Sequence, residues 1–337
     1  MQYHYIESRD TNPHRNLALE QFVFDKLNRD HCYFMLWQNH NAIIVGKHQN
    51  TQEEINAKFV RENNISVVRR LSGGGAVYHD LGNLNFTFIV PSGKTGIDFS
   101  VFCEPVCRAL RSFGVPVEIS GRNDMTIEGK KFSGNAQYIK EGRVMHHGTI
   151  LYDSDLSMLS RALKPGKDKI ESKGIKSVQS RVTNIRPYMG TDMSVTDFWA
   201  ALKSYMSAAF NMKDLTLTSG QKAGVDELTE KIYNQWSWNY GNSPPHTLRK
   251  VRRVESCGKI EMFLDMGREG KIKNIAFCGD FFGNLDPAGL GDKLKGHSLE
   301  YGELKTLLAG VEVSEYFHGL DADGLLEILT WPTARQP

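Results

Sequence analysis

Residues 69–83 read Arg69-Arg70-Leu71-Ser72-Gly73-Gly74-Gly75-Ala76-Val77-Tyr78-His79-Asp80-Leu81-Gly82-Asn83, and no other stretch says as much about fold and function. Three consecutive glycines allow positive φ and leave backbone N–H groups bare, so the backbone can close on a ligand. The two arginines offer planar forks of donors for a carboxylate or a phosphate. Strand-like sequence lies on both sides. We therefore interpret the stretch as a ligand loop for an anion rather than a surface turn.

Hydrophobic periodicity around this loop predicts alternating helices and strands. Residues 15–28 place Leu17, Glu20, Phe24 and Leu27 at helical spacing. Strands over 33–37 and 42–46 flank a predicted hairpin turn at 38–41. The other predicted elements of this part are strands over 65–70 and 84–90, short strands through 117–152, and helices over 99–114, 194–211 and 224–236.

A proline pair marks the best domain boundary, in Gly241-Asn242-Ser243-Pro244-Pro245-His246. We predict a large domain over 1–243 and a small C-terminal α/β accessory domain over 247–337. The latter has strands over 259–265 and 271–277 around a Gly267/Gly270 turn, and helices near 287–295 and 300–309. Because long crossover helices are few, the large domain is expected to be α+β, with a mixed, mostly antiparallel sheet packed by helices.

Composition excludes several classes of protein. The formal net charge of +2 is too small to argue for nucleic acid, and no apolar stretch approaches the roughly 18–20 residues of a membrane span. The N-terminus does not resemble a secretory signal. Five cysteines form no disulfide framework, which favours free thiols and a cytoplasmic location. Eight Lys/Arg residues between 249 and 273 form either a solvated face or a docking surface for an acidic partner.

Familiar catalytic signatures are absent from the sequence. Ser92-Gly93-Lys94-Thr95 lacks the glycine that a P-loop needs at position 88, where Phe88 stands. No G-x-G-x-x-G, H-E-x-x-H or paired C-x-x-C occurs. A nucleophilic Ser or Cys triad has no local signature either.

Three further polar segments carry candidate site residues. In 121–137, Glu128-Gly129 predicts a hairpin turn, and simple alternation places Lys131 and Ser133 on one face with Phe132 on the other. Adjacent His146 and His147 point to opposite faces of a strand, so one is expected to be structural and the other could reach the site. The basic, polar segment 173–185 reads as a loop over the sheet.

Taken together, these segments resemble the lipoate–protein ligases of the biotin/lipoate ligase superfamily. The matching pieces run from Arg69 to Asn83, then Gly121-Arg122-Asn123-Asp124, Lys131-x-Ser133-Gly134, His146-His147-Gly148-Thr149, Lys173-Gly174-Ile175, Ser177-Val178-x-Ser180-Arg181-Val182-Thr183-Asn184, and Trp236-x-Trp238-Asn239-Tyr240-Gly241. The G-R-G-R-x-G loop of biotin ligases is absent.

The resemblance implies a fold of that superfamily and an ATP-dependent, AMP-forming reaction. Lipoate and ATP give lipoyl-adenylate, and the lipoyl group then passes to a lysine of an acceptor domain, in 2-oxoacid dehydrogenase complexes or glycine cleavage H protein. It implies ATP, Mg²⁺ and lipoate as ligands, and neither nucleic acid nor a membrane as partner.

The same resemblance suggests roles for individual residues. Lys131 is the catalytic residue, in contact with the adenylate phosphate and the lipoyl carboxylate. Asp124 is a metal or adenine contact. The remaining binding residues are Arg70, Ser72 near the carboxylate, Gly74, the backbone of Gly75, Ala76, Val77 and Tyr78, His79 and Asn83 on the pyrophosphate side, and His147.

Two alternatives are less favoured. An acyltransferase of the same superfamily would move octanoyl or lipoyl groups between carriers through a cysteine thioester. The 250–337 extension and the lack of a cysteine in 121–185 favour the ligase. A catalytically silent acyl- or nucleotide-binding protein is disfavoured by the presence of Lys131 and an intact glycine loop.

Overall fold

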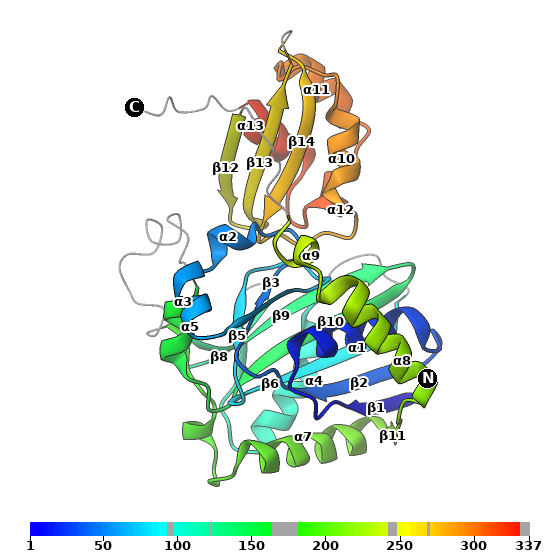
Figure 1. The fold of residues 1–337 in the computed structure, drawn as a ribbon, viewed down its shortest axis with the longest axis vertical. Helices are drawn as coiled ribbons and strands as arrows, with labels where there is room; N and C mark the ends of the chain where they lie inside the picture. Colours follow the sequence, from blue (N-terminus) through cyan, green and yellow to red (C-terminus); the bar gives the residue numbers. More distant parts are fainter. Residues whose placement is uncertain (93–97, 121–122, 164–180, 242–247, 268–269, 331–337) are drawn as a thin grey trace. The chain divides into compact units, whose positions relative to one another are not determined.

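The computed structural model describes residues 1–92, 98–120, 123–163, 181–241, 248–267 and 270–330 (Figure 1). The chain divides into two compact units. The first comprises Met1–Val45, Thr51–Leu71 and Ala76–Gly241, and the second comprises Gly46–Asn50, Ser72–Gly75 and Asn242–Pro337. The proline pair expected at the domain boundary lies outside the described residues.

An eight-stranded sheet with the order β11-β1-β2-β6-β10-β9-β8-β7 forms the centre of the first unit. Strand β1 runs parallel to β2 and β11, whereas the other pairs are antiparallel. The mixed, mostly antiparallel sheet is therefore confirmed. The strands are β1 (Tyr3–Glu7), β2 (Cys32–Trp37), β6 (Asn83–Pro91), β7 (Glu118–Ser120), β8 (Asp124–Ile127), β9 (Lys130–Lys140), β10 (Arg143–Leu151) and β11 (Lys213–Asp214).

Helices cover both faces of this sheet (Figure 1). Helix α1 (Pro13–Lys26) begins at Asn12, whose side chain accepts hydrogen bonds from two backbone N–H groups of the first turn. With α8 (Ser219–Leu228) and the π-turn η3 (Thr229–Tyr233), it packs on the face that carries Tyr33, Met35 and Trp37. On the other face lie α4 (Ser100–Ser112) and α7 (Val195–Phe210), where Phe88 contacts Phe102 of α4 and Phe210 of α7.

The predicted helices over 15–28, 99–114 and 194–211 are confirmed to within a few residues. The helix expected over 224–236 instead starts five residues earlier, as α8, and its α-helical part ends at Leu228. After η3, a short helix α9 (Trp236–Tyr240) completes this segment.

The prediction of a hairpin turn at residues 38–41 is wrong, because β2 and β3 (Ala42–Val45) do not pair with each other. Strand β3 belongs to a separate three-stranded sheet, where it pairs in parallel with β4 (Ser66–Arg69) and antiparallel with β5 (Val77–His79). Both edges of β2 are already occupied by β1 and β6. Because every residue of β2 and β3 is buried, neither strand has a solvent face whose alternation could fix its partner. Helices α3 (Ala57–Glu62) and α5 (Leu156–Ala162) contribute buried residues to the core of this small sheet. The short helix α2 (Thr51–Glu54) precedes α3 in the chain.

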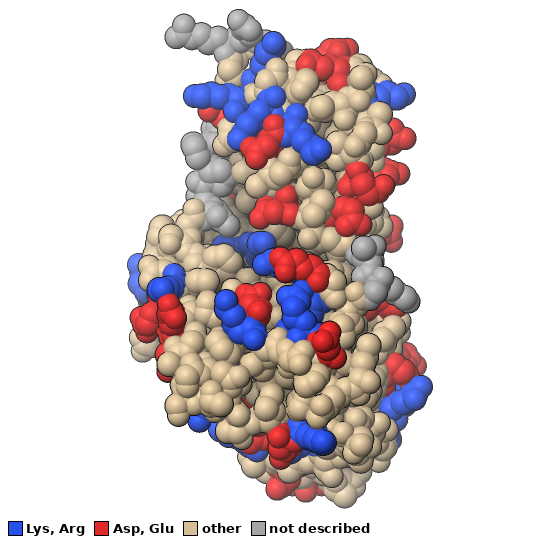
Figure 2. All heavy atoms as spheres, turned by 90° about the vertical axis from the view of Figure 1, so that its right-hand side faces the viewer, with Lys and Arg blue, Asp and Glu red and all other residues tan. Residues whose placement is uncertain are grey.

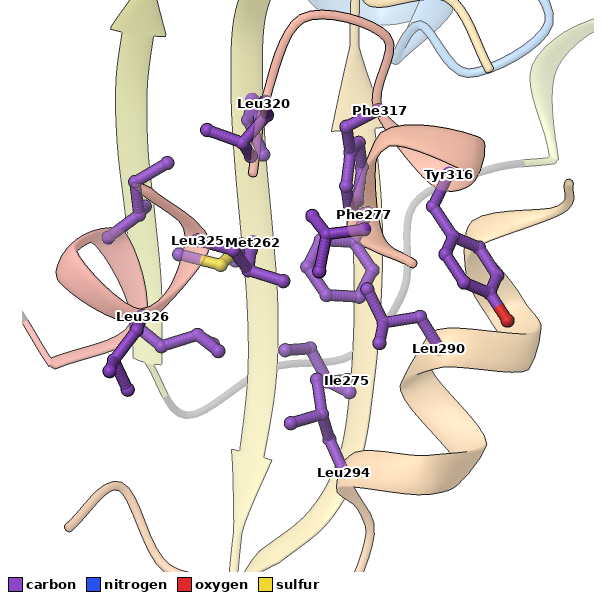
Figure 3. Packing of buried hydrophobic residues seen from close by; sticks show 14 of the residues in the cluster. Met262, Ile275, Phe277, Leu290, Leu294, Tyr316, Phe317, Leu320, Leu325 and Leu326 are labelled. Atoms are coloured by element: carbon purple, nitrogen blue, oxygen red, sulfur yellow. The ribbon is translucent and has the colours of Figure 1, made fainter. Parts of the chain in front are cut away.

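The second unit contains an antiparallel sheet of β12 (Leu248–Val254), β13 (Gly258–Met266) and β14 (Ile272–Gly279). Helices α10 (Pro287–Leu294), α11 (Tyr301–Leu308), α12 (Val313–Tyr316) and α13 (Ala322–Thr330) supply the rest of its core. Figure 3 shows Met262 and Phe277 of the sheet among Leu290 of α10, Leu325 of α13 and Phe317, which directly follows α12. The predicted strands and helices of this region are confirmed.

No helix in the described part of the chain is long and apolar enough to cross a bilayer.

One buried arginine holds the C-terminal end of α1. Arg143 is 1% exposed, and its guanidinium donates to the backbone oxygens of Val23, Phe24, Leu27 and Asn28. We predict that Arg143→Met lowers the free energy of unfolding by about 3 kcal/mol, because these carbonyls lose a charged donor while remaining buried. Arg143→Lys, which keeps the charge, should lose less. Urea unfolding measures both, and equal stability of Arg143→Met and wild type would contradict this role.

Candidate active site

A lysine and an aspartate face each other across the β8–β9 hairpin. Lys131 Nζ lies 2.7 Å from Asp124 Oδ1, and the two side chains are 38% and 36% exposed. The turn between the strands is formed by Glu128 and Gly129, with φ of 52° and 73°, which confirms the predicted hairpin. An ammonium group that is partly exposed and already paired with a carboxylate can contact an anionic ligand.

A β-bulge determines which face Lys131 occupies. Met125 pairs with Ser133, but Thr126 pairs with Lys131, so Phe132 is an extra residue on the β9 side. The extra residue reverses the alternation and puts Lys131 on the face of Asp124 and Gly134. The prediction that Lys131 and Ser133 share a face is therefore wrong.

The side chain of Lys131 extends over a glycine. A Cβ placed on Gly134 would come within 2.9 Å of Lys131 Nζ and 3.0 Å of its Cε. Gly134 N also donates to Thr149 Oγ1 at 3.1 Å. Lys131 O accepts from Thr183 N at 2.9 Å. Thr183 belongs to the predicted loop over 173–185, of which residues 173–180 lie outside the described residues.

A buried polar cluster lies on the same sheet face, toward α1. Trp37 Nε1 donates to Thr87 Oγ1 at 2.9 Å, and Thr87 donates to Glu20 at 2.5 Å. Glu20 also accepts from His147 Nδ1, at 3.1 and 3.2 Å from its two carboxylate oxygens. His147 pairs in register with Ala136, two residues from Gly134 on β9. The sheet therefore connects this cluster to the lysine hairpin.

Arg69 and Arg70 have different surroundings. Arg70 is buried and donates to Ile44 O at 3.2 Å; burial lowers the pKa of its guanidinium to about 10, against the opposing effect of nearby Glu20. Arg69 donates to Thr51 Oγ1 and to the backbone oxygens of Trp238 and Asn239. Arg69 thus anchors α9, while Arg70 lies near the buried carboxylate.

His79 and Asn83, expected on the pyrophosphate side, are buried. Burial and nearby Arg70 lower the pKa of His79 to about 3. Its Nδ1 accepts from Asn39, and its Nε2 has no hydrogen-bond partner among the described residues. Asn83 donates to Asn85 Oδ1 at 2.9 Å. His79 Nε2 and Asn83 Oδ1 are thus buried polar atoms that have no hydrogen-bond partner in the described part of the chain, which is unusual unless something else binds there.

The glycine loop belongs to the second unit. Gly74 has a φ of 88°, and its N–H donates to Phe281 O at 3.3 Å. A Cβ on Gly73 would lie 2.3 Å from the same oxygen, so only glycine fits there. Ser72 is buried, and its backbone oxygen accepts from Lys47 N at 2.9 Å.

The residues that follow the glycines return to the first unit. Ala76 leads into β5, where Val77 and Tyr78 pair with β3, and the Tyr78 hydroxyl donates to Asn41 at 3.1 Å.

Sequence reasoning missed Glu20 as a site residue. Its signal was present, because Glu20 falls on the otherwise apolar stripe of Leu17, Phe24 and Leu27, and it is only 2% exposed. A carboxylate on the buried face of a helix requires a polar partner inside the protein. Here those partners are Thr87 and His147.

The cysteines do not support thioester chemistry. All five lie in the described part of the chain, and all are buried and outside any disulfide. Burial raises the pKa of Cys103 to about 12 and that of Cys107 to about 11. A thioester-forming nucleophile needs a thiolate, which these environments disfavour.

The basic segment 249–273 is largely compensated by acidic groups. Arg249 and Lys259 share Glu261, Arg252 pairs with Glu327, Arg253 with Asp280 and Lys273 with Asp265. Figure 2 likewise shows acidic side chains among the basic ones on the face it presents. These pairs favour the interpretation of a solvated face.

Two family models match the chain. Residues 12–207 match the lipoyl protein ligase A/B catalytic domain, and residues 243–329 match the bacterial lipoate protein ligase C-terminus. The chain belongs to the lipoate–protein ligase family. The first match contains the lysine hairpin, the buried cluster and the glycine loop, so the described site lies within the family's catalytic domain.

A named relative matches nearly the whole chain. Lipoate-protein ligase LplJ of Bacillus subtilis is 41% identical over 330 residues, which cover 96% of this chain and 99% of that protein.

Solved structures also match. LipL1 of P. falciparum in complex with lipoate has a TM-score of 0.78 at 25% identity, covering 98% of this chain and all of that one. Lipoate-protein ligase A bound with ATP has a TM-score of 0.61 at 26% identity, covering 72% and 99%. A bipartite ligase from Thermoplasma acidophilum, studied with its E2 lipoyl domain, has a TM-score of 0.64 at 28% identity, covering 74% and 100%.

The space above Gly134 provides a direct test of the lysine's placement. A methyl group in Gly134→Ala would displace Lys131 Nζ, and we expect lipoate-dependent pyrophosphate release from ATP to fall about 10- to 100-fold. Gly220→Ala is the matched control, because a Cβ there meets nothing within 4 Å. Equal rates for the two variants would contradict the assigned position of Lys131.

Buried His79 should make stability depend on pH. Between its folded pKa of about 3 and the ordinary histidine pKa of 6.5, the unfolded chain binds a proton that the folded chain does not, so the free energy of unfolding rises with pH and levels off above this range. The contribution lost between pH 7 and pH 5 is about 2 kcal/mol. His79→Asn, which keeps an acceptor near Nδ1, should show a correspondingly shallower dependence in urea unfolding. Identical slopes would refute this assignment.

Proposed function

We propose that this ligase activates lipoate with ATP, releasing pyrophosphate, and that Lys131 is its catalytic residue. The observation that carries the proposal is the Lys131–Asp124 pair. It is partly exposed and lies over Gly134, on the sheet face that also holds His147. A partly exposed ammonium group beside a bare backbone is suited to an anionic reaction centre.

In the first step a lipoate carboxylate oxygen attacks the α-phosphorus of ATP. One O–P bond forms, the bond to the leaving oxygen breaks, and pyrophosphate departs. Two anions must approach, so fixed positive charge lowers the barrier. We propose that Lys131 supplies this charge to both the carboxylate and the phosphate. Arg70, His147 and the side chains of His79 and Asn83 are proposed binding residues.

The glycine loop is proposed to contribute backbone donors. Gly74, Gly75, Ala76, Val77 and Tyr78 would hold the nucleotide, and Ser72 would lie near the carboxylate. The open space at Gly75, where a Cβ would meet nothing within 4 Å, supports a close approach between the backbone and the phosphates at that residue.

In the second step the ε-amine of an acceptor lysine attacks the carbonyl carbon of lipoyl-adenylate. The amide bond forms, AMP leaves with the electron pair of the C–O bond, and the amine loses a proton. We propose lipoyl domains of 2-oxoacid dehydrogenase complexes and glycine cleavage H protein as acceptors. The Thermoplasma acidophilum ligase, studied with its E2 lipoyl domain, supports the first class. The five buried cysteines, none of which forms a disulfide, support a cytoplasmic location.

A divalent cation fits this site only if the phosphates of the nucleotide supply most of its ligands. Among the described residues no group of three or more His, Cys, Asp or Glu side chains could hold a metal. Asp124 offers one carboxylate, and one or two carboxylates with substrate phosphates are typical for Mg²⁺. We propose that Asp124 is that ligand, and that Mg²⁺ offsets phosphate charge when it is bound.

The domain organisation is proposed to follow the sequence. Residues 1–243 would form the catalytic domain and residues 247–337 the accessory domain. The ranges of the two family models support this division.

Replacing the catalytic lysine tests the proposal. Lys131→Ala removes the charge, and we expect lipoate-dependent pyrophosphate release to fall by about 10²- to 10³-fold or more. Lys130→Ala, the preceding and more exposed residue of the hairpin, is the control. Activity of Lys131→Ala equal to that of the control would refute the role of Lys131. Acyl transfer between carriers without any pyrophosphate release would instead favour the acyltransferase.

A further inference from the structure

A chain of buried side chains lies on the sheet face opposite Lys131. It begins at the entrance to α4, where Gln137 accepts from Asp98 N at 3.2 Å and donates to Asp98 O at 2.5 Å. Gln137 Nε2 contacts His146 Nδ1 at 3.1 Å, and His146 Nε2 contacts Asn135 Oδ1 at 3.2 Å. All three side chains are 3% exposed or less.

Asn135, the last residue in this series of hydrogen bonds, also bonds to residues on both sides of the β8–β9 hairpin. Asn135 Nδ2 donates to Asn123 O at 3.1 Å and to Ser133 Oγ at 3.2 Å. Asn123 in turn donates to Asn135 O at 2.6 Å. Asn123 immediately precedes Asp124, and Ser133 immediately follows the extra residue of the bulge. Asn135 is therefore bonded to the backbone just before Asp124 and to the side chain of Ser133, two residues after Lys131.

The partners define a single direction of hydrogen bonding. Asn135 Oδ1 can only accept, so His146 Nε2 carries the proton; Gln137 Nε2 can only donate, so His146 Nδ1 accepts. The ring is thus neutral, in agreement with a pKa held well below its ordinary value by burial. It stacks against Phe102 at 4.9 Å and Phe86 at 5.9 Å, which fixes its plane.

A glycine keeps the space for this contact. A Cβ on Gly148 would lie 2.2 Å from Asn135 Oδ1 and 2.5 Å from a ring carbon of Phe86. Gly148 therefore lets Asn135 reach the histidine. Neither His146 nor Asn135 has a role in the chemistry described above, but Asn135 bonds Asn123, which precedes Asp124, and Ser133, which follows the bulge beside Lys131.

We infer that His146, acting through Asn135, is a positioning residue that keeps the bulged hairpin in the conformation that presents Lys131. The inference rests on the proposed catalytic role of Lys131. A well-formed buried network with every donor and acceptor used fixes one backbone geometry, whereas the hairpin alone has a bulge and a turn that could relax. Small misplacement of a catalytic group affects the chemical step more than ligand binding.

Three substitutions of His146 separate positioning from stability. His146→Gln places an amide nitrogen near the position of Nε2 and can still donate to Asn135. His146→Asn places an acceptor near Nδ1 and can satisfy only Gln137. His146→Leu satisfies neither. Trp199→Phe, which removes a buried hydrogen bond to Tyr5 in the same unit, is the control for lost stability.

For each full-length variant we would measure kcat and both KM values of lipoate-dependent pyrophosphate release, together with the thermal midpoint. We expect kcat to fall about 10-fold or more in His146→Leu and His146→Asn, with both KM values within about 2-fold of wild type. His146→Gln should recover most of kcat. Trp199→Phe should lose thermal stability and keep kcat.

Other outcomes would overturn the inference. It fails if His146→Asn retains as much kcat as His146→Gln, a comparison that remains available if His146→Leu does not fold. It also fails if kcat follows the thermal midpoint across all variants, Trp199→Phe included. Lys131→Ala, measured in parallel, separates the two hypotheses. Normal activity of Lys131→Ala would reject the proposed catalytic role of Lys131. Loss of activity in Lys131→Ala together with normal kcat in the His146 variants would reject only the positioning role of His146.

Discussion

The placement of Lys131 depends on one extra residue in a strand. Without Phe132 in the bulge, alternation would send Lys131 to the face of Ser133 and Asn135, away from Asp124 and Gly134. The bulge costs a break in the ladder, and such breaks persist where the surroundings specify them. Here the surroundings are asymmetric. On one face Asn135 bonds the Asn123 carbonyl and the Ser133 hydroxyl, and on the other Lys131 pairs with the Asp124 carboxylate and lies over Gly134.

The two faces of the central sheet each carry a cluster of buried polar side chains, where apolar side chains are usual. The Glu20, Thr87 and His147 cluster lies toward α1, and the His146 and Asn135 chain lies toward α4. Adjacent histidines on β10 serve the two systems separately, as a strand's alternation requires. Burying a polar group costs free energy unless the group is hydrogen-bonded. The gathering of such groups on β6, β9 and β10 therefore indicates that these strands are selected for function as well as for stability.

Much of this architecture follows from local sequence. Helix α1, the Glu128-Gly129 hairpin and the antiparallel β13–β14 pair have strong local signals, and each forms where it is expected. The partner of β3 could not be predicted, because its fully buried residues carry no alternation. The predicted face of Lys131 was wrong for a different reason. A bulge depends on hydrogen bonds such as those of Asn135 with Asn123 and Ser133, and the alternation of apolar and polar residues along the strand does not reveal them. Glu20 was visible as a carboxylate on an apolar stripe, but its partners His147 and Thr87 come from distant strands.

The most direct test is a crystal structure of the full chain with a non-hydrolysable lipoyl-adenylate analogue. The account predicts that the bulge at Phe132 persists and that Lys131 Nζ lies within hydrogen-bond distance, about 3 Å, of an oxygen at the phosphate–carboxyl junction. An analogue bound with this junction away from Lys131, while the Asp124–Lys131 pair stays closed, would contradict it.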